Sequence, residues 1–435
     1  MEAVEKLRAD AVVVGSGPGG ATVARDLTLR GKNVIILEWG SDNKPTGTVF
    51  AAGRFMGGAF ALGRGMLIAP GMLTMIRCIT LGGTTMMYLG TAYDPPAETF
   101  KKYGVDLTAE LVDGIKQELN VHPFPDEYIG PRARMIMQAG RDLGYEWNKL
   151  NKFTNSPGKP ASRDFFYGCT NEAKWQARDW VLDAAAQGAL LMTNTYCEEV
   201  IVEGNTATGV RATGRGGRQF EISADHVIVA AGGIGSPTLL QRSGLHDAGR
   251  QFFIDPFVIA FGYLDRSLEA EIPMVTGTRL EEGIMITDMT TPLMMHLFYT
   301  LNAGKTLKTF KAGQVVSLMT KIRDDLDGNV SIGGGIAGGV TKPLTFDDLY
   351  KLNKGKAISG QILRKIGARD IWYSRNAAAH PGGTCRIGRI VDANLQTEYK
   401  NLYVADCSVI PEPWGLPPVL TIVCLARRLS RHLTS

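Results

Sequence analysis

A glycine-rich turn near the N-terminus is the clearest candidate for chemistry in this sequence. It follows an apolar run, opens a helical stretch and consists of Gly15, Ser16, Gly17, Pro18, Gly19 and Gly20. Glycines in the pattern Gly-x-Gly-x-x-Gly allow a tight turn, a close approach to a pyrophosphate and close helix–strand packing. Unpaired N–H groups at the helix N-terminus would face the phosphates. The turn therefore predicts a dinucleotide site.

Glu38 follows the third glycine of this pattern by 18 residues. Its carboxylate can accept hydrogen bonds from a ribose diol, and its negative charge disfavours a 2′-phosphate and hence NADP. The alternative is an ordinary strand–helix turn with a surface glutamate. The turn and Glu38 do not choose between NAD and FAD.

The elements that must hold this turn form a strand–helix–strand unit. We expect a strand over 9–14, a helix over 20–30 and a strand over 33–38. A third buried strand over 225–231 runs directly into Gly232. These runs predict a buried parallel sheet.

The sequence between these strands has other patterns. Residues 51–90 are rich in Gly and Met without a clear period, which indicates an extended loop containing a short helix. Helices are expected within 100–150 and over 176–192, and two strands meet at Asn205. Longer alternating strands over 251–340 predict an antiparallel sheet.

The predicted fold class is α/β: a Rossmann-like domain with a doubly wound parallel sheet, interrupted by an antiparallel-sheet α+β substrate domain. The predicted segments are 1–90 (cofactor domain, first part), 91–150 (helical cap), 151–250 (cofactor domain, second part), 251–375 (substrate domain) and 376–435 (cofactor domain, C-terminal part).

Composition excludes several classes of protein. The net charge is +4 with scattered Lys and Arg, so no nucleic-acid footprint is expected. No apolar run reaches the ~18–20 residues that span a bilayer, and the first ten residues do not resemble a signal peptide. Six widely spaced cysteines without Cys-x-x-Cys predict no metal site and a reducing compartment. We expect a cytoplasmic protein, with peripheral membrane contact left open.

Three further motifs follow the glycine turn. They are Gly82-Gly83-Thr84-Thr85, the run from Gly232 to Leu245, and His380-Pro381-Gly382-Gly383-Thr384 followed by Asp406-Cys407-Ser408. In this order the segments resemble the glucose–methanol–choline (GMC) oxidoreductases, although residues 251–375 carry no matching motif. The resemblance implies FAD, an antiparallel sheet over the isoalloxazine, and oxidation of an alcohol by hydride transfer to flavin N5.

The resemblance also implies which residues contact FAD. The loop Gly82, Gly83, Thr84 and Thr85 would run along the flavin, and Asp406 would help to close the cofactor site. Val200 resembles the adenine-contacting position. The remaining cofactor residues implied are Ala231, Gly232, Pro417 and Pro418. No histidine lies beside the Gly-Gly-Thr-Thr loop, so FAD is expected to be non-covalent.

His380 matches the catalytic histidine of the family. An imidazole with a pKa near neutrality suits a base that takes the hydroxyl proton of an alcohol. The family has a second His or Asn 9 residues before an alanine of the last helix, here Ala426, and that position is Pro417. Proline offers no side-chain donor. The second polar group is therefore absent unless the substrate domain supplies one.

The first hypothesis is an FAD-dependent dehydrogenase for a small alcohol, apolar or partly apolar, with His380 as general base. Its electrons would pass to a quinone or a redox protein rather than to oxygen. Pro417 favours an alternative: C–C or C=C redox chemistry, an elimination or a light-driven reaction. A third hypothesis is a non-catalytic flavin electron carrier. The apolar loop over 55–79 is interpreted as packing over FAD or as an entrance for an apolar substrate or quinone.

Overall fold

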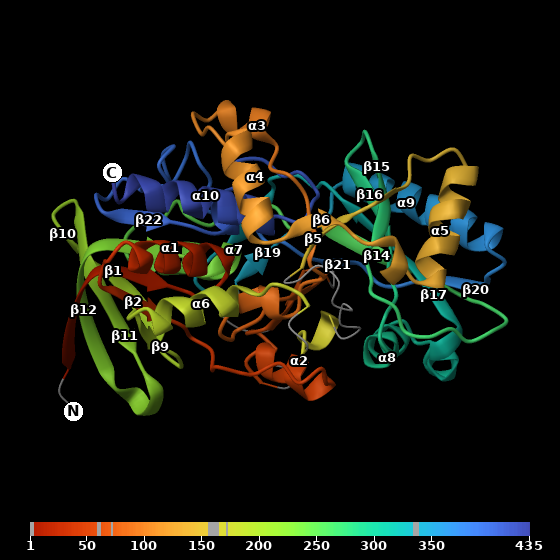
Figure 1. Cartoon of the computed structure of the whole chain (residues 1–435), viewed down its shortest axis with the longest axis horizontal. Coiled ribbons are helices and arrows are strands. Elements are labelled where there is room, and N and C mark those ends of the chain that lie inside the picture. The colour runs from red at the N-terminus through yellow and green to blue at the C-terminus, as the bar shows by residue number, and fades with distance from the viewer. Residues whose placement is uncertain (1–3, 59–61, 71–72, 155–164, 171–172, 334–338) are drawn as a thin grey trace.

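The computed structural model describes residues 4–58, 62–70, 73–154, 165–170, 173–333 and 339–435, so part of the apolar loop over 55–79 lies outside it. Its two large sheets occupy the two halves of the long axis (Figure 1).

Within the described residues the first sheet has the order β10-β11-β12-β1-β2-β9, with β22 beside β12. β1 pairs in parallel with β12 and β2, and β2 pairs in parallel with β9. This arrangement confirms the Rossmann-like prediction. The strands are β1 (Glu5–Val14), β2 (Val34–Leu37), β9 (Leu190–Met192), β10 (Tyr196–Glu203), β11 (Thr206–Thr213), β12 (Gln219–Val229) and β22 (Leu402–Val404).

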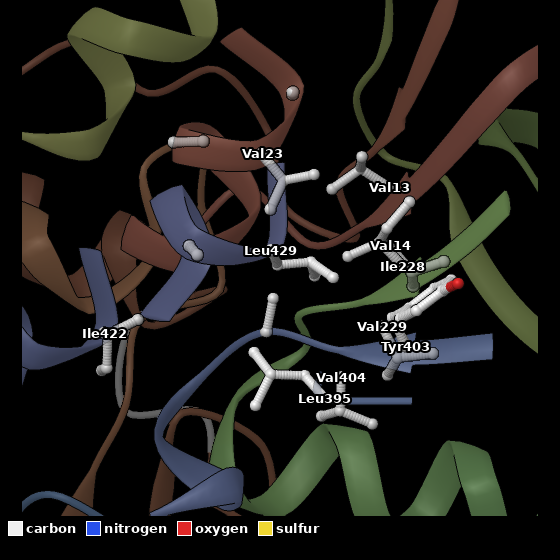
Figure 2. Close-up of a cluster of buried hydrophobic side chains, with 14 of the residues drawn as sticks. Val13, Val14, Val23, Ile228, Val229, Leu395, Tyr403, Val404, Ile422 and Leu429 are labelled. Carbon is white, nitrogen blue, oxygen red and sulfur yellow. The ribbon is translucent and has the colours of Figure 1, made fainter. Parts of the chain in front are cut away.

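Helices from both ends of the chain complete this domain. α1 (Pro18–Leu29) packs against α6 (Ala177–Ala186) and α10 (Val419–His432), while α7 (Gly232–Arg242) follows β12. Figure 2 shows Val13 of β1, Val23 of α1, Val404 of β22 and Leu429 of α10 in one buried cluster. Burying such side chains contributes about 1.5–3 kcal/mol each, so β22 and α10 help to stabilise the core around the first sheet.

The second sheet has the order β3-β4-β21-β14-β17-β16-β15-β7 in the described chain, with β20 beside β14. Its long strands pair antiparallel, which confirms the predicted substrate sheet. The strands are β3 (Met66–Ala69), β4 (Leu73–Ile76), β7 (Asn148–Lys149), β14 (Pro256–Tyr263), β15 (Thr276–Leu280), β16 (Ile284–Asp288), β17 (Val315–Ile322), β20 (Arg369–Tyr373) and β21 (Ala377–Ala378).

The two faces of this sheet have different neighbours. Val316 and Leu318 of β17 pack with α5 (Pro131–Asp142) and α9 (Phe346–Lys365). Met319 joins a cluster on the other face that reaches α8 (Leu293–Asn302). Because side chains alternate along a strand, Lys321 shares the face of Met319.

Two predictions about local structure were wrong. Residues 51–90 include the hairpin of β3 and β4, which joins the second sheet through β21, in addition to the predicted short helix, α2 (Val49–Phe55). The helix predicted to 192 ends at Ala186, because Gly188 adopts a φ of +108° and β9 follows.

The other elements are short. They are α3 (Ala97–Lys101), α4 (Ala109–Glu118), β5 (Thr91–Ala92), β6 (Val121–Pro123), β8 (Asn151–Phe153), β13 (Arg250–Phe252), β18 (Gly328–Val330), β19 (Val340–Thr341) and the 3-10 helices η1 (Gly83–Met86), η2 (Asp126–Tyr128), η3 (Phe165–Tyr167), η4 (Arg215–Gly217), η5 (Thr306–Gln314) and η6 (Cys407–Val409). Among the helices of the described ranges, none has the length and apolar character to cross a bilayer. The domain boundaries at 90, 150, 250 and 375 stay a prediction.

Candidate active site

The glycine turn joins β1 to α1, and its glycines have different surroundings. A Cβ at Gly15 would lie 2.3 Å from the Ala230 carbonyl oxygen, and one at Gly19 would lie 1.7 Å from that of Ala405. At Gly17 a Cβ would meet no atom of the described chain within 4 Å. Gly15 and Gly19 are therefore needed for packing of the protein itself, whereas Gly17 faces open space.

The N-terminus of α1 is suited to an anion. Pro18 occupies its first turn, which contains no acid, and no side chain caps the helix. The unsatisfied N–H groups and the helix dipole favour a phosphate here. A Cβ at Gly20 would lie 2.0 Å from the Gly15 carbonyl oxygen, so this glycine holds α1 close to the turn.

Glu38 lies at the end of β2 and is buried. Its carboxylate accepts hydrogen bonds from the Ser16 N–H at 3.2 Å, the Ser16 hydroxyl, and the Gly40 N–H at 2.7 Å. Burial raises the pKa of Glu38 despite these donors. The carboxylate thus reaches the glycine turn directly.

The loop Gly82–Thr85 lies against the glycine turn, although it is far from the turn in sequence. The Gly82 N–H donates to the Ser16 hydroxyl oxygen at 3.0 Å, and a Cβ at Gly83 would lie 3.1 Å from Gly17 Cα. The Thr85 hydroxyl donates to the Gly82 carbonyl at 2.6 Å, which fixes the loop. The structure therefore brings these two predicted segments together.

Thr84 faces the other way in this loop: its hydroxyl oxygen accepts a hydrogen bond from the Cys78 N–H at 3.3 Å. The side chain is therefore tied to the strand hairpin, and its backbone remains beside the glycine turn.

Asp406 joins the C-terminal segment to the start of α7. Its Oδ2 accepts hydrogen bonds from the Gly232 N–H at 2.8 Å and from the Ser236 hydroxyl. Ala231 is the residue before α7, and a Cβ at Gly232 would meet open space. At Gly233 a Cβ would lie 1.9 Å from the Pro381 carbonyl oxygen. The start of α7 is therefore packed against the loop of His380.

Val200 lies in β10. Its N–H donates to the Ser243 hydroxyl oxygen at 2.9 Å, at the end of α7. The Thr195 N–H, one residue before the same strand, donates to the Glu38 carbonyl at 2.9 Å. The N-terminal end of β10 therefore adjoins the end of β2.

Pro417 and Pro418 are buried in the loop that leads into α10. A Cβ at Gly415 would lie 2.8 Å from the Arg323 backbone nitrogen, just beyond β17. The loop of Pro417 is therefore packed against the end of the strand that carries Lys321.

His380 contacts two charged residues of the second sheet. Its Nδ1 lies 3.0 Å from an Asp255 carboxylate oxygen and 3.2 Å from the Lys321 Nζ, and Lys321 lies 3.6 Å from Asp255. Asp255 and Lys321 are fully buried, whereas 26% of the His380 side chain is exposed. We call these three residues the histidine cluster.

Strand register assembles the histidine cluster. Phe257 pairs with Ala377 on β21 and with Lys321 on β17. Asp255 precedes Phe257 by two residues, and His380 follows Ala377 by three. A long lysine side chain can reach such a diagonal neighbour. The junction of three strands therefore brings Asp255, Lys321 and His380 together.

Burial and charge set the protonation of the cluster. Burial raises the pKa of Asp255 to about 7, although Lys321 opposes the rise. Burial lowers the pKa of Lys321 to about 8 against the attraction of Asp255. Burial, and then the positive charge of Lys321, lower the pKa of His380 well below 6.5. The imidazole is therefore neutral at physiological pH and can accept a proton.

Two residues of the cluster have unusual backbones. The φ of His380 is +58° and that of Asp255 is +48°, a left-handed region in which only a few per cent of non-glycine residues lie. The Asp255 N–H donates to Asp324 at 3.0 Å, and Lys342 pairs with Asp324 at 3.0 Å. Left-handed backbones held by buried ion pairs are typical of functional sites.

Sequence reasoning missed Asp255 and Lys321. The available signal was a lysine within the apolar strand Val315–Ile322 and an aspartate between apolar runs before Pro256. A charge in a buried strand requires a partner, but the sequence does not say which one.

A dinucleotide-type parallel sheet and an antiparallel sheet are combined in this chain, with His380 beside the antiparallel one. Models of GMC oxidoreductase match residues 9–257 and 353–426. An uncharacterised GMC-type oxidoreductase of Mycobacterium tuberculosis is 28% identical over 96% of this chain and 75% of its own. A long-chain-alcohol oxidase of Arabidopsis thaliana is 24% identical over 99% and 69%. Pyridoxine 4-oxidase from Mesorbium loti has the same fold, with a TM-score of 0.74, 17% identity and coverage of 98% and 99%.

The chain belongs to the GMC oxidoreductase family, the FAD-dependent enzymes that act on CH–OH groups. The family membership sets aside the hypothesis of a non-catalytic electron carrier.

Proposed function

We propose that this enzyme oxidises the CH–OH group of a small alcohol, apolar or partly apolar, with His380 as the general base. The observation that carries the proposal is the partly exposed imidazole of His380, whose Nδ1 lies within hydrogen-bond distance of Asp255 and Lys321. We also propose a cytoplasmic location and, as electron acceptor, a quinone or a redox protein. The named relatives include oxidases, so oxygen is tested as the competing acceptor.

The histidine cluster can hold and move one proton. When Nδ1–H donates to Asp255, the tautomer leaves Nε2 as the free acceptor. Nε2 then takes the proton from the substrate hydroxyl, and the Asp255 carboxylate stabilises the imidazolium that forms. Burial, and then the Lys321 charge, lower the pKa of His380 and keep the imidazole neutral beforehand. Bound FAD would supply the hydride acceptor.

The test is anaerobic mixing of the purified enzyme with primary alcohols of increasing chain length. We expect the visible absorbance of the flavin to disappear, and to return on addition of a quinone analogue faster than on addition of oxygen. If no alcohol reduces the flavin, the proposal is wrong, and a faster return with oxygen would make the enzyme an oxidase.

We propose that FAD is held non-covalently by the predicted residues at the turn, the Gly82–Thr85 loop, Glu38, Val200, Ala231, Gly232, Asp406, Pro417 and Pro418. Support comes from the open space at Gly17 and the free N-terminus of α1. The histidine nearest the N-terminus is His122, so no histidine lies beside the Gly82–Thr85 loop to attach FAD covalently. Heat denaturation is therefore expected to release all of the flavin into solution.

The substitutions Gly17→Ala and Gly19→Ala should separate cofactor binding from folding. Gly17 has a φ of −67°, which alanine adopts freely, and open space around it. We expect Gly17→Ala to leave the melting temperature of the FAD-free protein unchanged and to weaken FAD binding at least about tenfold, since 1.4 kcal/mol is tenfold in affinity. Gly19→Ala should destabilise the FAD-free protein, because its Cβ would overlap the Ala405 carbonyl.

Calorimetry and flavin titration of the FAD-free variants provide the measurements. Equal FAD affinity in Gly17→Ala and the wild type would place the pyrophosphate elsewhere.

A second candidate function rests on Pro417, which occupies the position of the second polar group. The proposal is a GMC-fold enzyme with other chemistry, such as C–C or C=C redox, elimination or a light-driven reaction. We expect Pro417→Asn to change alcohol turnover by less than about tenfold if Lys321 and Asp255 already supply the polar contacts that His380 needs as a base. A much larger increase in turnover, at unchanged FAD content, would favour the second candidate.

A further inference from the structure

Helix α8 exposes large apolar side chains near both of its ends. His296, Tyr299 and Thr300 are buried, whereas Leu293 and Leu301 are exposed. A surface helix normally places polar residues on its outer side. The outer side of α8 therefore suits an apolar environment rather than water.

The segment that follows α8 extends this apolar side. In η5, the side chain of Leu307 is 82% exposed and that of Phe310 is 90% exposed. We call Leu293, Leu301, Leu307 and Phe310 the α8–η5 face. Such a group of large exposed apolar side chains indicates an interaction surface.

Basic residues alternate with these apolar residues in the sequence. Lys305, Lys308 and Lys311 occupy η5 and its start, and Lys308 and Lys311 both pair with Asp370, at 3.4 and 3.2 Å. With Asp370 included, the group keeps a net charge of +2. The sequence from 289 to 322 contains no Asp or Glu, although about one residue in ten of the chain is acidic.

A second acid-free stretch lies next to the first. Residues 43–93 contain no Asp or Glu, and Phe50 of α2 is 80% exposed. Ala52 of α2 and Tyr299 of α8 belong to one hydrophobic cluster. Figure 1 shows α2 and α8 along the same lower side of the molecule.

We propose that the α8–η5 face, flanked by Phe50, docks on the surface of an anionic lipid bilayer. Exposed Phe and Leu side chains would enter the boundary between headgroups and acyl chains, and the lysines would contact the negative headgroups. Interleaved apolar and basic residues with a net positive charge match this surface, which is apolar inside and anionic outside. No helix of the described residues spans a bilayer, so the contact would be peripheral.

The position of the α8–η5 face relates the proposed membrane contact to the candidate active site. The hydrophobic cluster behind α8 also contains Leu416, the neighbour of Pro417. An apolar alcohol or a quinone dissolved in the bilayer would therefore be close to the candidate active site. Membrane docking itself does not depend on the reaction, and its test measures binding alone.

The chain contains a matched control surface at the start of α9. Phe346 is 94% exposed, with Leu349 and Tyr350 exposed nearby. Asp347 lies between them and pairs with Lys351, and Asp348 is buried, so this patch exposes apolar side chains without a net positive charge. It should not bind an anionic bilayer.

The experiment is co-sedimentation of the full-length, FAD-loaded protein with two kinds of vesicle. One is phosphatidylcholine alone, and the other contains about one-third phosphatidylglycerol. We expect binding to the anionic vesicles, at least about 20-fold weaker in the double variant Leu307→Ser, Phe310→Ser and about fivefold weaker in Lys305→Gln. Phe346→Ser should bind as the wild type does. Melting temperatures should agree within about 2 °C, because the altered side chains are exposed.

Three results would overturn the proposal. The first is no binding of the wild type to anionic vesicles. The second is an equal loss of binding in Phe346→Ser. The third is self-association of the wild type that the double variant abolishes, without vesicle binding, which would make the face a contact between copies of this chain.

Discussion

Asparagine at position 380 is expected to slow reduction of the flavin by an alcohol about 10²–10⁴-fold, the usual contribution of a general base. The amide cannot take the hydroxyl proton that Nε2 of His380 would accept. Asparagine tolerates the φ of +58° at this position, so the loop should keep its shape. Alanine would add about 1–2 kcal/mol of backbone strain and is the poorer choice. Anaerobic stopped-flow absorbance gives the rate.

The control for His380→Asn is chemical reduction of the flavin, which should proceed normally at unchanged FAD content. A variant that reduces its flavin within a few-fold of the wild-type rate would show that His380 is not the base. The base would then have to be sought elsewhere in the substrate domain.

Lys321→Met is expected to lower the free energy of unfolding by about 3–5 kcal/mol, because it leaves the buried Asp255 without a counter-charge. Adding Asp255→Asn removes both charges and should restore most of this loss, since replacing a whole buried ion pair is often close to neutral. Asparagine also tolerates the φ of +48° at position 255. Denaturant unfolding of the single and double variants measures the recovery.

The pH dependence of kcat/KM separates positioning of His380 from a purely structural role. In the wild type, burial and then Lys321 lower the pKa of His380 well below 6.5, so protonation of the imidazole itself should reduce activity only at a pH below 6.5. Lys321→Met removes one of the two causes, and the protonated, inactive imidazole should persist to a higher pH. The acid limb therefore moves upward. An unmoved acid limb would mean that Lys321 only stabilises the fold.

Much of the cofactor domain could be predicted from the sequence because its signals are local. The turn Gly15–Gly20, the strands beside it and Glu38 lie within about 30 residues, the usual length of such a unit. The structure brings Gly82 and Asp406 to the same domain through hydrogen bonds with Ser16 and Gly232. The hairpin of β3 and β4 was missed because its strands are short and gain stability from β21, far along the chain.

The histidine cluster needed the tertiary structure. His380 was predicted, but Asp255 is 125 residues and Lys321 59 residues distant from it. Period-2 alternation tells which side chains share a face of one strand, and it does not tell which strands pair or in which register. The sequence raised the question of what replaces the second polar group at Pro417. Long-range pairing of β14, β17 and β21 placed a buried carboxylate and a buried ammonium group behind the histidine.

The sequence by itself determined the dinucleotide turn, the family and the candidate base, because each depends on residue types at short, fixed spacings. Only the tertiary structure decided which charges contact His380, which glycine faces open space, and which apolar side chains remain outside the core. Those properties depend on atoms brought together from distant segments, and burial, which sets the pKa of each cluster residue, exists only once the sheets have packed.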